Sequence, residues 1–394
     1  MPRAPALADT PAAVRARLTR VHFAAPPVAV DAFALSVPLQ APVVTSFGTM
    51  HDRPALLVRL RDADGREGWG EAWCNFPPGG AAQRATIVAR MVAPLLAEIA
   101  PPGPAALFAA LTRRFHVIGL QTAEPGLFDQ VAAGVDIAAW DLAARQHGVA
   151  LWRLLGATGA AGAVPCYASG INPGDVDACI GAARAAGYRA FKVKLGFGID
   201  RDLQTLHAAR AAAGPLTLMA DVNQGWSVAQ ARAALPRLGD AGLAFLEEPV
   251  PADTPLARWR ALAAVAPMPL AAGENLRDAR LVAAARSGAF GLLQPDIAKW
   301  GGFSGLLPRI RQIAACGVAY WPHYLGAAVG LVASAHLLRA AGGRGMLEVD
   351  ANPNPLRSAL GAPLTLDADG ALPVPDVPGL GFAPDPAALA ACAA

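Results

Sequence analysis

The sequence predicts an α/β fold in which a parallel (β/α) barrel follows a smaller α+β domain at the N-terminus. Two observations support this prediction. After residue 165, short apolar segments alternate with Ala-, Arg- and Leu-rich helical segments, and strands that are buried on both faces of a parallel sheet have this unbroken apolar character. Up to about residue 150 the pattern is mixed instead, with strand segments first and longer helical segments after them.

The N-terminal domain is expected to consist of strands followed by helices. Residues 30–39 and 55–61 have strand character, and Asp62-Ala63-Asp64-Gly65 predicts a hairpin turn into a third strand over residues 67–72. A calcium loop would need further oxygen ligands after this turn, and they are missing. Helical patterns follow near residues 81–97, 104–115 and 127–147. Residues 1–20 have no continuous apolar core, so we expect a loose terminal arm rather than a signal peptide.

The strands of the predicted barrel are short, and each is followed by a helix or a return segment. They cover residues 165–168, 190–195, 216–221, 244–247, 270–273, 292–294, 319–322 and 346–348. A doubly wound open sheet is the alternative arrangement. It would be supported by a glycine-rich phosphate turn, but Gly196-Phe197-Gly198 lacks the third glycine and the acidic residue that such a turn requires.

The composition of the 394 residues excludes several classes of function. Lys and Arg total 33 and Asp and Glu total 30, so the net charge is +3, and no basic run favours nucleic acid or a membrane surface. We therefore expect a small-molecule partner. The five cysteines are scattered without a CxxC motif, which argues against disulfides and zinc and fits the cytoplasm. Residues 313–338 lack Asp, Glu, Lys and Arg, but Pro322, His323 and several glycines interrupt them, so we expect a buried strand and helix there.

Seven ionisable residues stand where predicted barrel strands end. By their residue numbers they follow one another at intervals of 22 to 27 residues: Lys194, Asp221, Glu247, Glu274, Asp296, His323 and Glu348. The carboxyl ends of parallel barrel strands meet at one mouth, where barrel enzymes keep their chemistry. Gathering so many charges in one place costs electrostatic free energy unless a ligand or metal offsets it. The pattern therefore predicts an active site at this mouth.

Three of these residues are carboxylates from consecutive strands, and they predict a metal site. Asp221, Glu247 and Glu274 would surround one point with oxygen ligands, which favours Mg²⁺ over zinc. Glu248 follows Glu247 in an extended strand and must point to the opposite side, so we expect it to have a supporting role. Asn223 lies two residues after Asp221, where it is either a substrate contact or a turn residue.

The remaining polar residues predict groups that transfer protons. Lys192 and Lys194 stand two apart on one strand, so both side chains point into the barrel. Their mutual repulsion and a nearby divalent cation would lower the pKa of one lysine toward the range of a general base. Ion pairing with neighbouring carboxylates is the alternative. Asp296 and His323 end adjacent strands, an arrangement in which a carboxylate orients an imidazole for acid–base catalysis.

Several short motifs together resemble the enolase superfamily, and more narrowly its mandelate racemase/muconate lactonizing enzyme branch. They are Gly68-Trp69-Gly70-Glu71, residues 135–142, Lys192-Val193-Lys194, Leu246-Glu247-Glu248-Pro249, Gln294-Pro295-Asp296 and Lys299-Trp300-Gly301-Gly302. The resemblance extends from about residue 28 to 384. It implies a modified (β/α)7β barrel under an α+β capping domain. We place the capping domain at residues 18–150, the barrel at 151–365, and a C-terminal segment that returns to the cap at 366–394.

The resemblance also implies chemistry in which Mg²⁺ and a Lys or His base turn a carboxylate substrate into an enediolate. The three metal ligands of the family correspond to Asp221, Glu247 and Glu274. Lys194 corresponds to the base on one face of the substrate, and Lys192 to a contact with the substrate carboxylate. Glu348 resembles the acid on the eighth strand that hydrogen-bonds the same carboxylate. We also expect a homo-oligomer.

One position indicates the mandelate racemase subgroup. Lactonizing and dipeptide-epimerase members have a second catalytic lysine three residues before the lysine of KxGG, and Asp296 occupies that place here. We therefore expect Lys299 to be structural. Asp296 with His323 resembles the pattern of the mandelate racemase subgroup. Mannonate-dehydratase-type members have a His where this chain has Asn223.

The reaction predicted within this subgroup is the dehydration of a hydroxy acid or sugar acid after α-proton abstraction. Glycine-containing segments at residues 194–198, 301–304 and 377–381 resemble acid-sugar members, including galactarolactone cycloisomerase. A racemase, an epimerase or a sugar-lactone cycloisomerase is the alternative within the same chemistry. A non-catalytic, metal-dependent sugar-acid binding protein is the alternative from another class.

Two loops of the cap are expected to choose the substrate, near residues 43–51 and 73–80. Phe47, Trp73 and Phe76 are the candidate substrate-binding residues. Few cations in these loops would meet a second carboxylate, so we expect a monocarboxylic hydroxy acid or a lactone rather than an open diacid.

Overall fold

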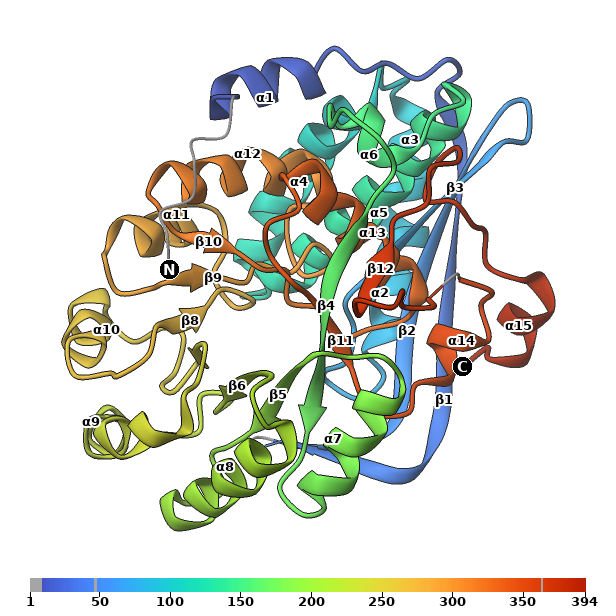
Figure 1. The fold of residues 1–394 in the computed structure, drawn as a ribbon. Coiled ribbons are helices and arrows are strands. Elements are labelled where there is room, and N and C mark those ends of the chain that lie inside the picture. The colour runs from blue at the N-terminus through green and yellow to red at the C-terminus, as the bar shows by residue number, and fades with distance from the viewer. Residues whose placement is uncertain (1–8, 46–47, 363) are drawn as a thin grey trace.

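The computed structural model describes residues 9–45, 48–362 and 364–394, and it has two layers of different character (Figure 1). The N-terminal layer contains an antiparallel sheet of order β1-β2-β3, formed by Pro27–Thr45 (β1), Gly48–Asp62 (β2) and Glu67–Ala72 (β3). Helical segments follow: Gly80–Ile87 (α2), Val88–Val92 (η1), Ala93–Glu98 (α3), Pro104–Gln121 (α4) and Pro125–Gln146 (α5). These elements confirm the predicted α+β domain and its hairpin.

The second layer is the predicted barrel. Its parallel strands are Ala163–Ile171 (β4), Ala190–Lys194 (β5), Thr217–Asp221 (β6), Leu246–Glu247 (β7), Leu270–Ala272 (β8), Leu292–Leu293 (β9), Ala319–Tyr320 (β10) and Leu347–Asp350 (β11). Strands β4 to β10 pair in chain order and β11 pairs with β4. No ladder joins β10 to β11 in the described part of the chain. Every predicted barrel strand is confirmed.

Helices connect these strands on the outside of the barrel (Figure 1). They are Val176–Ala185 (α7), Ile199–Ala213 (α8), Val228–Ala234 (α9), Leu235–Ala241 (η2), Leu256–Ala263 (α10), Asp278–Arg286 (α11), Gly302–Ala315 (α12) and Ala328–Ala340 (α13). Among the described residues, no helix is long and apolar enough to cross a membrane. Residues 313–338 form the end of α12, β10 and most of α13, as expected for a buried strand and helix.

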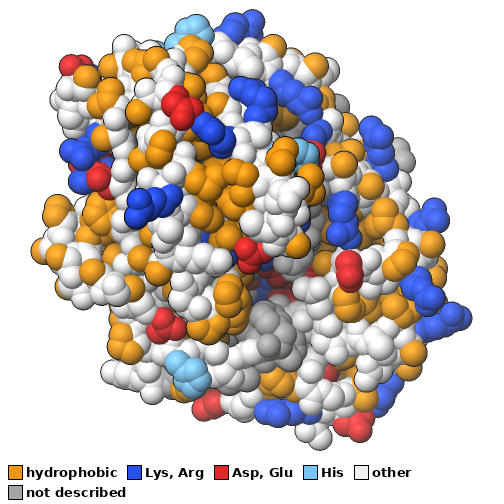
Figure 2. Space-filling model, turned by 180° about the vertical axis from the view of Figure 1, so that it is seen from behind, with side chains coloured by type: hydrophobic (Ala, Val, Ile, Leu, Met, Phe, Trp, Pro, Cys, Tyr) orange, Lys and Arg blue, Asp and Glu red, His pale blue; other side chains and the backbone are white. Residues whose placement is uncertain are grey.

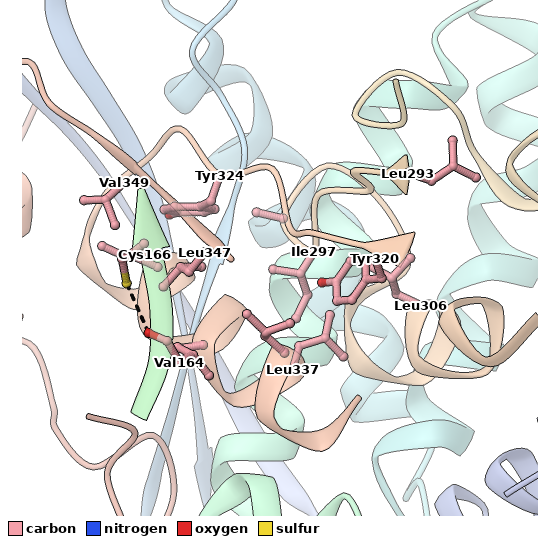
Figure 3. Close-up of a cluster of buried hydrophobic side chains, with 14 of the residues drawn as sticks. Val164, Cys166, Leu293, Ile297, Leu306, Tyr320, Tyr324, Leu337, Leu347 and Val349 are labelled. Carbon is pink, nitrogen blue, oxygen red and sulfur yellow. Dashed lines mark hydrogen bonds between the residues drawn. The ribbon is translucent and has the colours of Figure 1, made fainter. Parts of the chain in front are cut away.

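The core of the barrel is continuous where its last strand meets its first. Figure 3 shows Leu347 and Val349 of β11 next to Val164 and Cys166 of β4. All four side chains are buried, and the Cys166 thiol donates a hydrogen bond to the Val164 carbonyl oxygen. Burying a side chain of this size stabilises the fold by roughly 1.5–3 kcal/mol, so this seam holds the two ends of the sheet together.

The N-terminal segment corrects one expectation. Residues 1–20 were expected to form a loose arm, but Pro11–Leu18 is a helix (α1) that packs against α12. Thr10 caps it by accepting a hydrogen bond from the Ala13 N–H, and Val14 and Leu18 are buried. Val14 and Leu18 are four residues apart and lie on one face of the helix. The arginines around them made this apolar pattern hard to recognise in the sequence.

The Gly68-Trp69-Gly70-Glu71 motif allows β3 to lie directly on α5. A Cβ atom on Gly70 would stand 2.0 Å from the Gly134 carbonyl oxygen, and one on Gly68 would stand 2.3 Å from the Ala138 carbonyl oxygen. The Trp69 N–H between them donates a hydrogen bond of 2.8 Å to Asp141 of α5. Only glycine permits this close approach, because any Cβ would collide with the helix backbone.

The C-terminal segment joins the two layers. After Pro355–Ser358 (α14), the strand Ala371–Pro373 (β12) pairs with β4, and Pro386–Ala391 (α15) leads the chain back to β1. The Ala394 N–H donates to the Ala34 carbonyl oxygen, and the Ser36 N–H donates to the Cys392 carbonyl oxygen. The cap is therefore completed by the end of the chain, as expected.

His336 of α13 forms hydrogen bonds with the C-terminal segment and with the short helix Leu151–Leu154 (α6). The Trp152 N–H donates to His336 Nδ1 at 3.1 Å, so the other ring nitrogen carries the proton and faces the Leu380 carbonyl oxygen at 3.3 Å. The bond from the Trp152 N–H requires the neutral ring, because a protonated Nδ1 cannot accept it. Burial lowers the pKa of His336 to about 4, against a small opposing effect of the Leu380 carbonyl.

This histidine should make the fold less stable in mild acid. Between about pH 6.5 and pH 4 the unfolded chain binds a proton at this position and the folded protein does not, so the free energy of unfolding should fall by about 3 kcal/mol as the pH decreases through that window. His336→Asn keeps an acceptor for Trp152 but does not titrate. Melting temperatures measured from pH 7 to pH 4.5 should therefore fall less steeply for this variant; parallel curves for the two proteins would contradict the prediction.

Candidate active site

The strand ends bring a lysine and two carboxylates into one row. In the parallel ladder Lys194 pairs with Asp221, and Asp221 pairs with Glu247. The hydrogen-bonded register thus places these three residues at the same height on β5, β6 and β7. Figure 2 shows a hollow on one face of the molecule with acidic side chains at its base.

Each predicted metal ligand is paired with a lysine. Lys194 Nζ lies 2.6 Å from Asp221 Oδ2, Lys299 Nζ lies 2.8 Å from Glu274 Oε2, and the Lys192 ammonium contacts Glu247. In the described part of the chain, no three His, Cys, Asp or Glu side chains form a ready group of metal ligands. The ammonium groups occupy the oxygens that a cation would need. The metal-ligand assignment therefore stays a prediction.

The donor set nevertheless fits a divalent cation. Glu247 Oε1 is buried and has no hydrogen-bond partner among the described residues. Burial raises the pKa of Glu247 to about 7, and the negative charge of Asp221 adds to the rise although Lys192 opposes it. Two neighbouring carboxylates that repel each other, with one buried oxygen unused, are better satisfied by a hard cation than by lysines alone.

The ion pairs of the two lysines act against the lowered pKa expected beside a divalent cation, which stays a prediction. A lowered pKa was expected for one of Lys192 and Lys194. Burial does act in that direction, but the charge of Asp221 outweighs it at Lys194, and the charges of Glu247 and Glu348 outweigh it at Lys192. The pKa of both lysines is raised as a result. Ion pairing, the alternative considered above, describes the lysines in this structure.

Lys192 lies deeper than its predicted role implies. Its side chain is completely buried, it pairs with Glu247, and its Nζ lies 2.7 Å from Glu348 Oε1. Glu348 also accepts a hydrogen bond from the Ser169 hydroxyl. Lys192, Lys194 and His323 hold the pKa of Glu348 at about 2 although burial alone would raise it. These residues form a charged floor below the mouth, and their contact with a substrate carboxylate stays a prediction.

The Asp296–His323 pair is formed as predicted. His323 Nδ1 lies 2.8 Å from Asp296 Oδ2, and the other Asp296 oxygen accepts hydrogen bonds from the Ala298 and Lys299 N–H groups. The second ring nitrogen, Nε2, faces Glu274 Oε2 at 3.3 Å. Burial would lower the pKa of His323, but the charges of Glu274 and Glu348 and the Asp296 hydrogen bond raise it to about 9.

Lys194 and His323 stand on different sides of the mouth. Strand β5 carries Lys194, and β6, β7, β8 and β9 separate it from β10, after which His323 follows. The arrangement places two groups that can transfer protons around one hollow, each next to a carboxylate.

Asn223 orients the predicted ligand Asp221, and Glu248 binds the loop that follows β8. The Asn223 N–H and side-chain amide donate to the two oxygens of Asp221 at 2.7 and 2.9 Å. Asn223 therefore acts as the turn residue of the two roles considered, and a substrate contact is untested. Glu248 has a φ of 34°, is buried, and accepts hydrogen bonds from the Asn275 amide. Burial, and then the charges of Glu274, Glu247 and Asp221, raise the pKa of Glu248 well above its usual range.

The cap reaches the mouth through Trp73. The Trp73 indole ring lies 4.6 Å from Lys299 Nζ, and the Trp73 backbone N–H donates to the Ala298 carbonyl oxygen at 3.1 Å. The ring of Phe76 lies 6.2 Å from that of Trp73. Phe47, the third predicted cap residue, lies outside the described residues.

Lys299 was assigned a structural role from the sequence; its contacts lie at the mouth, and its role stays a prediction. Besides Glu274 it binds Asn275 Oδ1 at 2.9 Å, and its side chain keeps 12% of its surface exposed. The sequence signal for this position was the spacing of three residues between Asp296 and Lys299. The Asp296 side chain accepts a hydrogen bond from the Lys299 N–H, which turns the loop back toward the mouth.

Both layers of the chain match known protein families. Residues 28–156 match the mandelate racemase/muconate lactonizing enzyme N-terminal domain, and residues 175–388 match the enolase C-terminal domain-like family. The chain belongs to the mandelate racemase/muconate lactonizing enzyme family of the enolase superfamily. The resemblance inferred from the sequence motifs is confirmed, and so is the α/β fold with a capping domain.

Three relatives illustrate the range of this family. The chain is 32% identical over 348 residues to D-galactarolactone cycloisomerase of Agrobacterium fabrum. The alignment covers 84% of this chain and 89% of the relative. It is similar to the crystal structure of a mandelate racemase/muconate lactonizing enzyme from Bordetella bronchiseptica RB50, with a TM-score of 0.87, 47% identity and coverage of 93% and 99%. It is also similar to the structure of an enolase from Bradyrhizobium complexed with magnesium and mandelic acid, with a TM-score of 0.82, 29% identity and coverage of 94% and 99%.

Membership in this enolase-superfamily family makes the chain an enzyme, either a lyase or an isomerase. A non-catalytic sugar-acid binding protein, the alternative from another class, is thereby set aside. Magnesium is typical of this family.

Proposed function

We propose that this enzyme removes the proton α to the carboxylate of a hydroxy acid or sugar acid and then eliminates a group from the β carbon, with Mg²⁺ as cofactor. The observation that supports this proposal is the Asp296–His323 pair on the far side of the mouth from Lys194. A reaction that removes a proton and then protonates a leaving group needs two such groups, whereas binding alone needs neither.

The residues have distinct proposed tasks. Lys194, in its neutral form, takes the α proton on one face of the substrate; a cation bound by Asp221 would favour that form over the ion pair. His323 serves the other face, where it delivers a proton to the leaving group or to the α carbon. Asp296 fixes the ring orientation and stabilises the imidazolium through Nδ1. Lys192, which lies below them, is proposed to bind the substrate carboxylate, and Glu348 to hydrogen-bond the same group in its protonated form, because an ionised Glu348 would repel it.

Asp221, Glu247 and Glu274 are proposed to hold Mg²⁺. The bound ion would supply positive charge that stabilises the enediolate oxygens. A magnesium complex of a similar protein supports this assignment, as does the unused oxygen of Glu247. Asn223, which binds both oxygens of Asp221, keeps that carboxylate at the mouth.

The leaving group separates two candidate reactions. If a β-hydroxyl leaves, the enzyme is an acid-sugar dehydratase, the reaction predicted from the sequence. If a ring oxygen leaves, it is a sugar-lactone cycloisomerase, and the similarity to D-galactarolactone cycloisomerase favours this second candidate. Both begin with the same proton abstraction. Racemisation or epimerisation uses the same groups without a leaving group.

The cap residues favour a substrate with a neutral distal end. Trp73 and Phe76 offer ring faces for stacking on a polyol or lactone. Arg53 of β2 is the cap arginine that reaches the barrel, and it is buried in contact with Asp350 at 2.6 Å. Because its charge is already matched, it is a poor partner for a second substrate carboxylate.

Hydrogen isotope exchange tests the proposal. Acid sugars, their lactones and aryl hydroxy acids would be incubated with the enzyme and Mg²⁺ in deuterium oxide and followed by nuclear magnetic resonance. Deuterium should enter the α position of at least one acid, and the product then separates dehydration from lactone opening. Absence of exchange across mono- and diacids would contradict the proposal.

Asp296→Asn should slow the reaction steps that depend on His323 by roughly 10²-fold or more, because the amide cannot stabilise the imidazolium and allows the wrong tautomer. The measurement is the turnover of the acid found by isotope exchange. Exchange of the α proton on the substrate face assigned to Lys194 should persist in Asp296→Asn. A normal turnover rate in Asp296→Asn would show that His323 works without its carboxylate and would contradict the subgroup assignment.

A further inference from the structure

The chain between β10 and α13 carries His323 and has no helical or strand structure of its own from residue 321 to residue 325. Side chains from elsewhere hold it instead. The Tyr324 N–H donates to Glu348 at 3.3 Å, the Leu325 carbonyl accepts from the Asn75 amide at 2.7 Å, and the Gly326 carbonyl accepts from the Asn354 amide at 2.9 Å. Apart from the hydrogen bond that the Tyr324 hydroxyl donates to the Ala327 carbonyl oxygen at 3.0 Å, these contacts on the loop of His323 come from outside the loop.

Glu71 of the cap makes the most extensive of these contacts. Its Oε1 accepts a hydrogen bond of 2.7 Å from the Ala327 N–H, and its Oε2 accepts one of 2.9 Å from the Gly330 N–H. The Tyr324 hydroxyl, which donates to the Ala327 carbonyl oxygen at 3.0 Å, also lies next to this carboxylate, whose pKa burial raises and the hydroxyl acts to lower. The carboxylate thus caps the first turn of α13 and holds the residue next to His323 in the same contact.

Gly326 and Gly330 leave no room for side chains of their own beside Glu71 and Tyr324. A Cβ atom on Gly326 would stand 2.6 Å from Glu71 Oε1 and 2.4 Å from the Tyr324 hydroxyl oxygen. One on Gly330 would stand 2.3 Å from the same hydroxyl oxygen. Tyr324 is itself buried among apolar side chains of the barrel (Figure 3). The two glycines let the carboxylate and the phenol meet at the start of the helix.

Alternate residues of the cap segment 71–75 face the two loops of the acid–base pair. Glu71 and Asn75 bind the loop that follows β10, and the Trp73 ring contacts Lys299 in the loop that follows β9, where the Trp73 backbone N–H also donates to the Ala298 carbonyl oxygen. An extended chain places every second residue on one side, so one short segment contacts both loops. The cap therefore contacts the barrel at the two loops that contain Asp296 and His323.

We propose that Glu71 is a positioning residue, which holds His323 in register with Asp296 by fixing the 323–327 loop and the first turn of α13 from the capping domain. This inference rests on the proposed function of His323. According to this inference, a carboxylate of the cap sets the position of the group that acts on one face of the substrate. This role is additional to the proposed role of the cap in choosing the substrate.

Glu71→Gln is the decisive variant. Its side chain has the same shape, but one carboxylate oxygen becomes an NH₂ group that cannot accept from a backbone N–H, so one of the two bonds is lost. Exchange of the α proton would be measured with both epimers of the acid identified by isotope exchange, with the Mg²⁺-loaded enzyme. Exchange on the His323 face should fall by about 10²-fold, the effect expected of a displacement of about 1 Å. Exchange on the Lys194 face should be unchanged within error.

Asp141→Asn is the matched control. Asp141 is another buried carboxylate of the cap that accepts backbone hydrogen bonds, but its partners are the Trp69 and Leu380 N–H groups and the Arg145 side chain, away from the loop of His323. This variant should lower the melting temperature without separating the two faces. Tyr324→Phe, which removes a single hydroxyl, provides a milder second test if Glu71→Gln folds poorly.

A second measurement does not depend on a substrate. Amide hydrogen exchange detected by mass spectrometry should become faster for the peptide covering residues 319–331 in Glu71→Gln, and for the peptide covering residues 379–381 in Asp141→Asn. Equal loss of both faces, or unchanged amide exchange over 319–331, would overturn the assignment of Glu71. If the wild-type enzyme exchanges no α proton of any acid, the proposed function fails, and the amide measurement still decides whether Glu71 holds the loop.

Discussion

Replacing Lys194 with alanine should remove α-proton exchange on one face of the substrate and preserve it on the other. General acid–base groups contribute about 10²–10⁴-fold to a reaction rate, so the turnover of Lys194→Ala should fall by on the order of 10³-fold. His323→Asn should show the reverse selectivity. The reason is the placement of the two groups after β5 and β10, on different sides of the mouth.

The measurement follows deuterium incorporation into each epimer separately, because total turnover would fall in both variants. Arg201→Ala serves as the control: it removes a cation from the start of α8, near Phe197, outside the proposed acid–base and metal-binding residues. Loss of exchange on both faces in either single variant would show that Lys194 and His323 act on one proton. That result would contradict the assignment of opposite faces.

Removal of divalent cations should abolish turnover while the fold persists. Charge stabilisation of an enediolate by a metal contributes several kcal/mol, which corresponds to a decrease on the order of 10³-fold or more after exhaustive chelation. Added Mg²⁺ should restore the rate. The circular dichroism spectrum should change little, because each of the three carboxylates has a lysine partner in this structure.

Calorimetric titration with Mg²⁺ checks the ligands independently of activity. Asp221→Asn, Glu247→Gln and Glu274→Gln should each weaken binding, since each removes one anionic oxygen ligand. Glu98→Gln changes an exposed carboxylate of α3 that pairs with Arg114 and should bind Mg²⁺ like the wild type. Full turnover after chelation, or unchanged affinity in all three ligand variants, would contradict the metal site.

The pairing of lysines with these carboxylates has a further consequence for the titration. Mg²⁺ and the ammonium groups compete for the same oxygens of Asp221, Glu247 and Glu274. The observed affinity should therefore include the free energy of breaking these ion pairs. Lys299→Met, which frees Glu274 from its lysine, is expected to bind Mg²⁺ more tightly than the wild type while losing the contact with Trp73.

The sequence by itself determined the fold class and the strand ends. A βα unit recurs at a nearly constant length, so ionisable residues spaced by one unit, such as Asp221 and Glu247, must arrive at the same mouth. The hydrogen bond between Asp296 and His323 follows from the same argument, because their strands are neighbours in the barrel. Local spacing was sufficient for these features.

The direction of the lysine pKa shifts was decided only by the tertiary structure. Burial lowers the pKa of an ammonium group and a nearby carboxylate raises it, and distances between side chains determine which effect is larger. A strand pattern shows that Lys192 and Lys194 point inward, but not that Lys192 would lie between Glu247 and Glu348. The α1 helix was missed for a related reason, since its burial depends on α12.

The anchoring of the His323 loop also came from the tertiary structure alone. Glu71 and Ala327 are separated by 256 residues, and the hydrogen bond between them exists because the cap is folded onto the barrel. Periodicity reports which face of an element is buried, and motif spacing reports which residues end neighbouring strands. Neither contains the distance between two separately folded layers, so the partner of a buried carboxylate such as Glu71 is set by how those layers pack.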